Sequence, residues 1–195
     1  MSEFRIGSRH PGAARYDVIR LLHHDHQRIL LAFHEFEDLH SQQARQACQH
    51  VAQRTFAELK VLAEVERQLF YPAIHPAIAG TDLIEQSQIE HARIQRVVSE
   101  LEQAEPGGAI FWKRFRTLGE YVRRHVEDEE GELFPMLSCV PIDWQRLYEK
   151  MTARRAELAE ELGVADALSM RTPAAPLAAV DRDPHDREPA LTFGR

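Results

Sequence analysis

Apolar side chains recur at alternating steps of three and four residues along four long segments of the chain. This spacing places them on one face of an α-helix, and no segment shows the period of two that a strand requires. Four such helices with short connections pack as an antiparallel bundle. The sequence therefore predicts an all-α fold, an up-down-up-down four-helix bundle with an additional C-terminal helix. The expected helices cover Asp17 to His40, Ser41 to Pro72, Asp82 to Leu101, Phe111 to Pro135 and Asp143 to Gly163.

The ends of the chain differ in composition from the part between them. Residues 1–15 are polar and contain Pro11 and Gly12, so we expect a flexible lead. Residues 16–162 form the predicted bundle, and its candidate helix caps are Asp17, either Thr81 or Asp82, and Asp143. Residues 163–195 are rich in Pro, Ala, Arg and Asp, and we expect them to form a disordered tail.

Composition excludes several classes of partner. A formal net charge of -7 argues against nucleic acid and against an anionic membrane surface, because both select for basic patches. No apolar run approaches the length of a membrane-spanning helix, and no signal peptide is apparent at the N-terminus. The two cysteines, Cys48 and Cys139, are too few for a disulfide framework, so we expect a cytoplasmic protein with free thiols.

Each of the four apolar faces is interrupted by residues that a bundle core does not tolerate without a partner. They are His26, Glu66, His91, His125 and Glu129. An unpaired ionised carboxylate in a core is very costly, and two would repel each other. A metal cation removes this difficulty, because it binds carboxylate oxygen and neutral imidazole nitrogen together. The alternatives are ordinary hydrogen-bonded core histidines and salt bridges from Glu66 to Arg67 or from Glu129 to Arg124.

The same pattern occurs twice in the chain. Asp25-His26-Gln27-Arg28-Ile29 matches Glu90-His91-Ala92-Arg93-Ile94 as acid-His-x-Arg-Ile. Glu66 and Glu129 are each followed six residues later by a proline, Pro72 and Pro135. The chain thus contains two copies of a helical hairpin, each with a His on its first helix and a Glu on its second. Two such hairpins can surround a metal at the centre of a bundle.

This arrangement resembles the hemerythrin-like, or HHE cation-binding, family from about Asp17 to Leu137. The resemblance implies a non-haem iron centre whose ligands are His26, Glu66, His91, His125 and Glu129, with both carboxylates bridging and His91 and His125 serving one iron. One departure is clear, because Leu62 stands where the family places a histidine four residues before Glu66. His23, one turn before His26, is the candidate replacement ligand, and Tyr121 is a weaker one.

The resemblance implies binding of oxygen or another small diatomic, or a response to iron or redox state, with one or two irons per chain. Zinc or manganese also suits these donors. Two alternatives remain open: a ferroxidase- or peroxidase-like enzyme, and a structural bundle with a degenerate or single-metal site. No nucleophilic triad, phosphate loop or nucleotide fingerprint is present, which argues against the usual hydrolase and kinase classes. We expect a binding protein rather than an enzyme. The sequence indicates neither a partner protein nor an oligomeric state.

Overall fold

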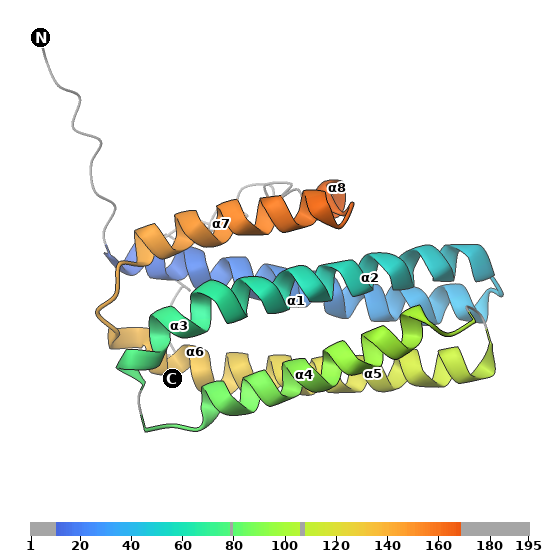
Figure 1. Cartoon of the computed structure of the whole chain (residues 1–195), viewed down its shortest axis with the longest axis horizontal. Coiled ribbons are helices and arrows are strands. Elements are labelled where there is room, and N and C mark those ends of the chain that lie inside the picture. Colours follow the sequence, from blue (N-terminus) through green and yellow to red (C-terminus); the bar gives the residue numbers. More distant parts are fainter. Residues whose placement is uncertain (1–10, 79, 106–107, 169–195) are drawn as a thin grey trace, which may run out of the picture.

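The computed structural model of the chain describes residues 11–78, 80–105 and 108–168. Helices joined by short loops make up these ranges, and they contain no strand, which confirms the all-α prediction (Figure 1). The bundle is built from four long helices, α1 (Pro11–Ser41), α2 (Arg45–Val65), α4 (Leu83–Glu102) and α5 (Ala109–Asp128). In Figure 1 they run in alternating directions, so that α1 pairs with α2 and α4 pairs with α5.

The predicted fifth helix covers one side of this bundle. It is α7 (Trp144–Glu161), and it packs against α1 and α2 (Figure 1). Its N-terminus confirms the predicted cap, because the Oδ1 atom of Asp143 accepts a hydrogen bond from the backbone N–H of Arg146 at 3.0 Å. Asp82 precedes α4 as expected but makes no capping hydrogen bond with its side chain.

Both prolines that were expected to end a helix lie inside one. After α2 the chain continues through a π-helical turn, η1 (Glu66–Phe70), into α3 (Tyr71–Ile74) and η2 (His75–Ala77). After α5 it continues in the same way through the π-helical turn η3 (Glu129–Leu133) into α6 (Phe134–Met136) and η4 (Leu137–Cys139). In a π turn the hydrogen-bond register is one residue longer, so the helix continues past a proline that has no N–H to donate.

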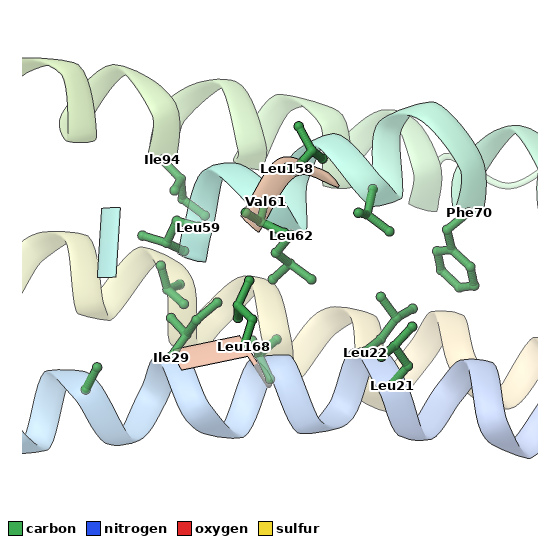
Figure 2. Packing of buried hydrophobic residues seen from close by; sticks show 14 of the residues in the cluster. Leu21, Leu22, Ile29, Leu59, Val61, Leu62, Phe70, Ile94, Leu158 and Leu168 are labelled. Atoms are coloured by element: carbon green, nitrogen blue, oxygen red, sulfur yellow. The ribbon is translucent and has the colours of Figure 1, made fainter. Parts of the chain in front are cut away.

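The core lies where the apolar faces of the helices meet. Figure 2 shows Leu22 and Ile29 from α1 opposite Leu59 and Leu62 from α2, with Ile94 from α4 beside them. Leu158 extends this core into α7, in which Met151 is also fully buried. The apolar residues that the sequence placed on one face of each helix are therefore buried, as the hydrophobic effect favours.

The helical region extends beyond its expected limits at both ends. α1 begins at Pro11 instead of Asp17, and Ala14 is already buried, so helix replaces the last part of the expected flexible lead. Proline is well suited to the first position of a helix. After Gly163, which has a φ of +70°, the short α8 (Ala165–Leu168) buries Leu168 where a disordered tail was expected. Residues 1–10 and 169–195, which carry the rest of these two predictions, lie outside the described residues.

Candidate metal centre

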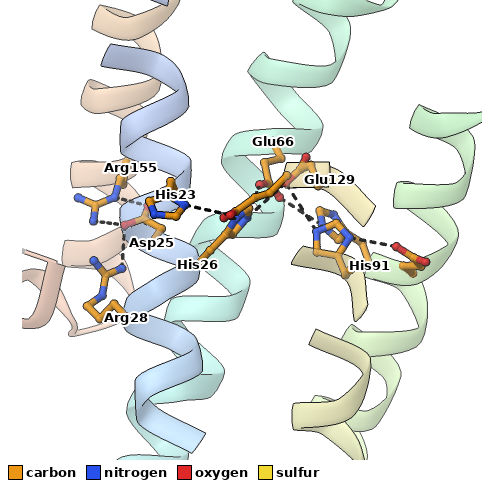
Figure 3. Close-up of polar contacts among 11 residues, drawn as sticks. His23, Asp25, His26, Arg28, Glu66, His91, Glu129 and Arg155 are labelled. Carbon is orange, nitrogen blue, oxygen red and sulfur yellow. Dashed lines mark hydrogen bonds and ion pairs between the residues drawn. The ribbon is translucent and has the colours of Figure 1, made fainter. Parts of the chain in front are cut away.

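The polar residues that interrupt the four apolar faces meet in the middle of the bundle (Figure 3). His26 comes from α1, His91 from α4 and His125 from α5, while Glu66 and Glu129 begin the two π-helical turns. Four of these side chains are at most 2% exposed, and only the side chain of His91 is partly accessible, at 12%. The helical hairpins thus bring together all five residues that were predicted from the sequence as ligands.

The Nε2 atoms of the three histidines point at the two carboxylates. His26 Nε2 lies 3.6 Å from Glu66 Oε1 and 3.2 Å from Glu129 Oε2. His91 Nε2 lies 3.2 Å from Glu66 Oε2 and 2.9 Å from His125 Nε2. His125 Nε2 is 4.0 Å from Glu129 Oε2. Pairing each histidine with a carboxylate in this way produces one continuous cluster of nitrogen and oxygen donors.

This donor set fits a metal ion. One donor atom from each of His26, Glu66, His125 and Glu129 lies within 4.8 Å of all the others. Bonds of about 2.0–2.2 Å to a transition metal place opposite ligand atoms about 4 Å apart. The four side chains would therefore need to shift only slightly to bind a metal. All four oxygens of Glu66 and Glu129 are buried, and none has a hydrogen-bond partner among the described residues. Buried polar atoms are normally satisfied, and a cation would satisfy these.

Charges within the cluster compensate one another when no metal is present. Burial alone would raise the pKa of Glu66, but the nearby imidazoles of His26 and His91 outweigh it and lower the pKa to about 2. Burial likewise opposes the protonation of His26, yet its contacts with Glu129, Glu130 and Glu66 raise the pKa of His26 well above 6.5. The pKa of His125 is also raised against the effect of burial, chiefly by Glu90. The imidazoles of His26 and His125 thus favour their protonated forms beside the carboxylates when no metal is bound.

Two further carboxylates orient the histidines from outside the cluster. Glu130 Oε1 lies 2.8 Å from His26 Nδ1, and Glu90 Oε2 lies 3.1 Å from His125 Nδ1. A carboxylate that accepts the Nδ1–H fixes the tautomer and leaves Nε2 free for a metal. Neither role was predicted from the sequence. Glu90 is the acid of the second acid-His pair and could have been found there, but nothing in the acidic run 127–130 distinguished Glu130.

Neither proposed substitute for the missing histidine lies at the centre. His23 is half-exposed, and its Nδ1 atom is 3.0 Å from Glu130 Oε2, with no contact to Glu66 or Glu129. Tyr121 is partly buried beneath the guanidinium of Arg93, which lies 5.4 Å from its ring centroid. Leu62 itself is buried. The position that His125 fills in the second hairpin is therefore occupied by an apolar side chain in the first.

The salt-bridge alternative for the buried carboxylates is not realised. Arg67 pairs with Glu64 at 2.6 Å, and Arg124 lies 3.7 Å from Asp128. Both arginines are largely exposed, so they do not neutralise Glu66 or Glu129. The histidines are the groups that compensate these two charges.

Comparison with known sequences agrees with this geometry. The pattern of the Hemerythrin HHE cation binding domain matches residues 17–137, which is more than half of the chain and includes every residue of the cluster. The chain belongs to this hemerythrin family. The family range ends before α7, so the helix that covers α1 and α2 lies outside the matched part of this hemerythrin-like chain.

A relative of known description is a DNA nickase from Nostoc sp. (strain PCC 7120 / SAG 25.82 / UTEX 2576). It is 26% identical over 118 residues, which cover 60% of this hemerythrin-like chain but only 32% of the relative. No solved structure matches the chain. Among the described residues, no helix combines the length and apolar character needed to cross a membrane.

Proposed function

We propose that this hemerythrin-like chain binds non-haem iron at His26, Glu66, His91, His125 and Glu129, and that the centre binds oxygen or another small diatomic molecule. The observation that carries this proposal is the set of four buried carboxylate oxygens that lack hydrogen bonds and face three imidazoles. Mixed imidazole and carboxylate donors suit iron, and also zinc or manganese. Glu66 and Glu129 each lie close to two histidines, which suits carboxylates that bridge two metal positions.

A small cavity beside the histidines supports the choice of ligand. It has about 10 Å³ of space for the centre of a water-sized sphere, which is about the minimum for one small molecule. His26, His91 and His125 line it together with apolar side chains (Ile29, Leu59, Leu62, Ala63, Ile94, Val122, Val126). The space admits only a very small molecule, and its mostly apolar lining disfavours ions, which suits a neutral diatomic. An iron with an unfilled coordination position supplies the point at which such a molecule binds.

The chain's own residues control this chemistry in three ways. Glu130 and Glu90 orient His26 and His125, the apolar side chains limit access of water, and Leu62 leaves one metal position with a single imidazole. The under-ligated position is also the feature that favours the enzymatic alternative, a ferroxidase- or peroxidase-like activity. A response to iron or redox state would use the same centre. The free thiols of Cys48 and Cys139 fit the cytoplasm, where we propose that the protein works.

DNA nicking is described for the Nostoc relative, and the alternative that this chain acts on DNA has less support. The chain spans 32% of that relative, and its formal net charge is -7. Proteins that bind nucleic acid neutralise phosphates with clustered Lys and Arg. The cluster is buried and consists of His and Glu side chains, so it is not a basic surface of this kind.

Metal content per chain tests the proposal. The full chain is purified under reducing, iron-supplied conditions, its metals are measured by elemental analysis, and its optical spectrum is recorded before and after exposure to air. Iron at one or two ions per chain with an oxygen-dependent absorption change supports the proposal. A chain that holds no metal, or whose melting temperature does not change on chelation, is instead a structural bundle.

A cavity-filling variant separates binding of a diatomic from the metal itself. Ala63→Leu adds volume to a residue that lines the cavity but supplies no ligand. We expect it to keep the iron content of the wild type and to lose most of the spectral response to air, at a cost of about 1–3 kcal/mol in stability. Turnover of peroxide or ferrous iron by the wild type would identify the enzymatic alternative.

A further inference from the structure

Tyr71 occupies a special place in the repeated pattern. It follows Glu66 by five residues, as Phe134 follows Glu129, and each aromatic precedes the shared proline by one position. Both rings pack on a histidine of the cluster that comes from the opposite hairpin. The ring centroid of Tyr71 lies 5.7 Å from that of His91, and the ring of Phe134 is stacked 6.1 Å from that of His26. The two aromatic residues therefore fill equivalent positions and differ by one hydroxyl group.

That hydroxyl is buried next to the carboxylates of the cluster. Tyr71 is 1% exposed, and its hydroxyl has no hydrogen-bond partner among the described residues. Burial and then the negative charges of Glu66 and Glu129 raise the pKa of Tyr71 well above 10, because both carboxylates lie near its hydroxyl. A buried hydroxyl without a partner is destabilising, because it has lost its hydrogen bonds to water. The other hydroxyl near it, that of Ser87, donates to the backbone carbonyl of Leu83 at 2.9 Å.

The surroundings of His91 are also more polar than those of His26 at a second pair of equivalent positions. Ser87 lies four residues before His91, and its counterpart four residues before His26 is Leu22. Next to His91 the chain thus places Tyr71 and Ser87, whereas next to His26 it places Phe134 and Leu22. The two hydroxyl groups therefore both lie on the side of His91 and His125, the side that already has two imidazoles.

We propose that the phenol oxygen of Tyr71 is a further metal ligand, at the position served by His91 and His125. This inference rests on the proposed function, because it requires a metal in the cluster. On binding, the phenol O–H bond breaks, an oxygen–metal bond forms, and the proton passes to bulk water without any change in oxidation state. A tyrosine phenolate is a hard oxygen donor that binds iron in proteins. The bond gives the buried hydroxyl oxygen the partner that the protein does not supply.

Spectroscopy of the iron-loaded, air-oxidised full chain tests this ligand. A phenolate bound to ferric iron gives a charge-transfer band in the visible region, and resonance Raman excitation into that band enhances tyrosine ring vibrations. We expect both signals in the wild type and neither in Tyr71→Phe, which keeps the ring against His91 but lacks the oxygen. Tyr121→Phe is the matched control, because Tyr121 lies under Arg93 outside the cluster and its loss leaves the band intact.

The outcomes distinguish this inference from the proposed function. Iron-loaded wild type without the phenolate signals, or Tyr71→Phe that retains them, overturns the assignment of Tyr71 and leaves the metal centre in place. A wild type that binds no iron overturns both. Loss of the signals in Tyr71→Phe at unchanged circular dichroism and with iron still bound supports the assignment.

Discussion

The two hairpins of the bundle, α1 with α2 and α4 with α5, share one sequence pattern, yet residues at equivalent positions make different contacts. Glu90 precedes His91 on α4 and contacts Nδ1 of the cluster histidine His125 on α5. Asp25 is its counterpart on α1, but Leu62 on α2 offers it no imidazole. Asp25 instead forms a two-point ion pair with Arg155 of α7, at 2.6 and 2.7 Å.

A second pair of equivalent positions shows the same divergence. In the second hairpin Arg93 lies over the ring of Tyr121, whereas in the first Arg28 contacts the buried carboxylate of Glu58 at 3.1 Å and Asp25 at 2.9 Å. The first hairpin therefore uses its polar residues for an ion-pair network that extends to α7. The hairpin that has Leu62 at the position equivalent to His125 is therefore also the hairpin against which α7 packs.

The largest effect is expected for the two carboxylates of the centre, to which each hairpin contributes one. Glu66→Gln or Glu129→Gln removes the charge that two histidines contact, so both variants should lose nearly all bound iron while circular dichroism shows an intact bundle. Glu64→Gln, which affects an exposed partner of Arg67, is the control and should keep its iron. Full metal content in either cluster variant would show that these carboxylates are not ligands.

The next largest effect concerns the network that only the first hairpin has. Arg155→Met leaves the buried carboxylate of Asp25 with Arg28 as its remaining partner, so we expect a loss of about 3 kcal/mol, the low end for a broken buried pair. Chemical denaturation should detect this loss. Arg154→Met, which removes an arginine that pairs with the exposed Glu157, should cost less than about 1 kcal/mol. Equal losses in the two variants would mean that Asp25 does not anchor α7.

A smaller effect is expected from making the hairpins alike. Leu62→His restores an imidazole at the place of His125, but Asp25 is held by Arg155 and does not orient the new ring. Loss of such an outer partner typically weakens metal binding about 10–100-fold. A metal titration of Leu62→His should thus show a second ion bound at least about tenfold more weakly than the first. Two equally tight ions would show that Asp25 need not be released from Arg155.

The smallest effect is expected from pH. The pKa of His26 in the folded protein lies well above 6.5, so its contribution to the stability of the metal-free protein is complete below pH 6.5 and is lost as pH rises through the folded-state pKa. Glu66 acts in the opposite range, because its contribution is lost only as pH falls from 4.5 toward about 2. Melting temperatures in chelator should therefore fall above neutral pH, whereas those of the metal-loaded protein should not, because metal replaces the proton.

The fold class and the five residues of the cluster could be predicted from the sequence alone. The buried face of a helix shows in the sequence as apolar residues that recur with the helical period. Charged residues at positions of that buried face have few explanations other than a metal. The repeat also located Leu62 as the point where the two hairpins differ. These features are local or periodic, so no knowledge of distant contacts was required.

The groups that surround the cluster depend on contacts between distant parts of the chain. Glu130 contacts His26, Arg155 contacts Asp25, and His23 lies on Glu130 instead of the buried carboxylates, each across more than 100 residues of sequence. No period relates such residues, because their pairing depends on how α1, α5 and α7 pack. The two π turns were likewise hidden, since a proline ends most helices unless the hydrogen-bond register changes before it. The residues that orient and enclose the centre could therefore be identified only from the packing of the helices, and not from the sequence pattern.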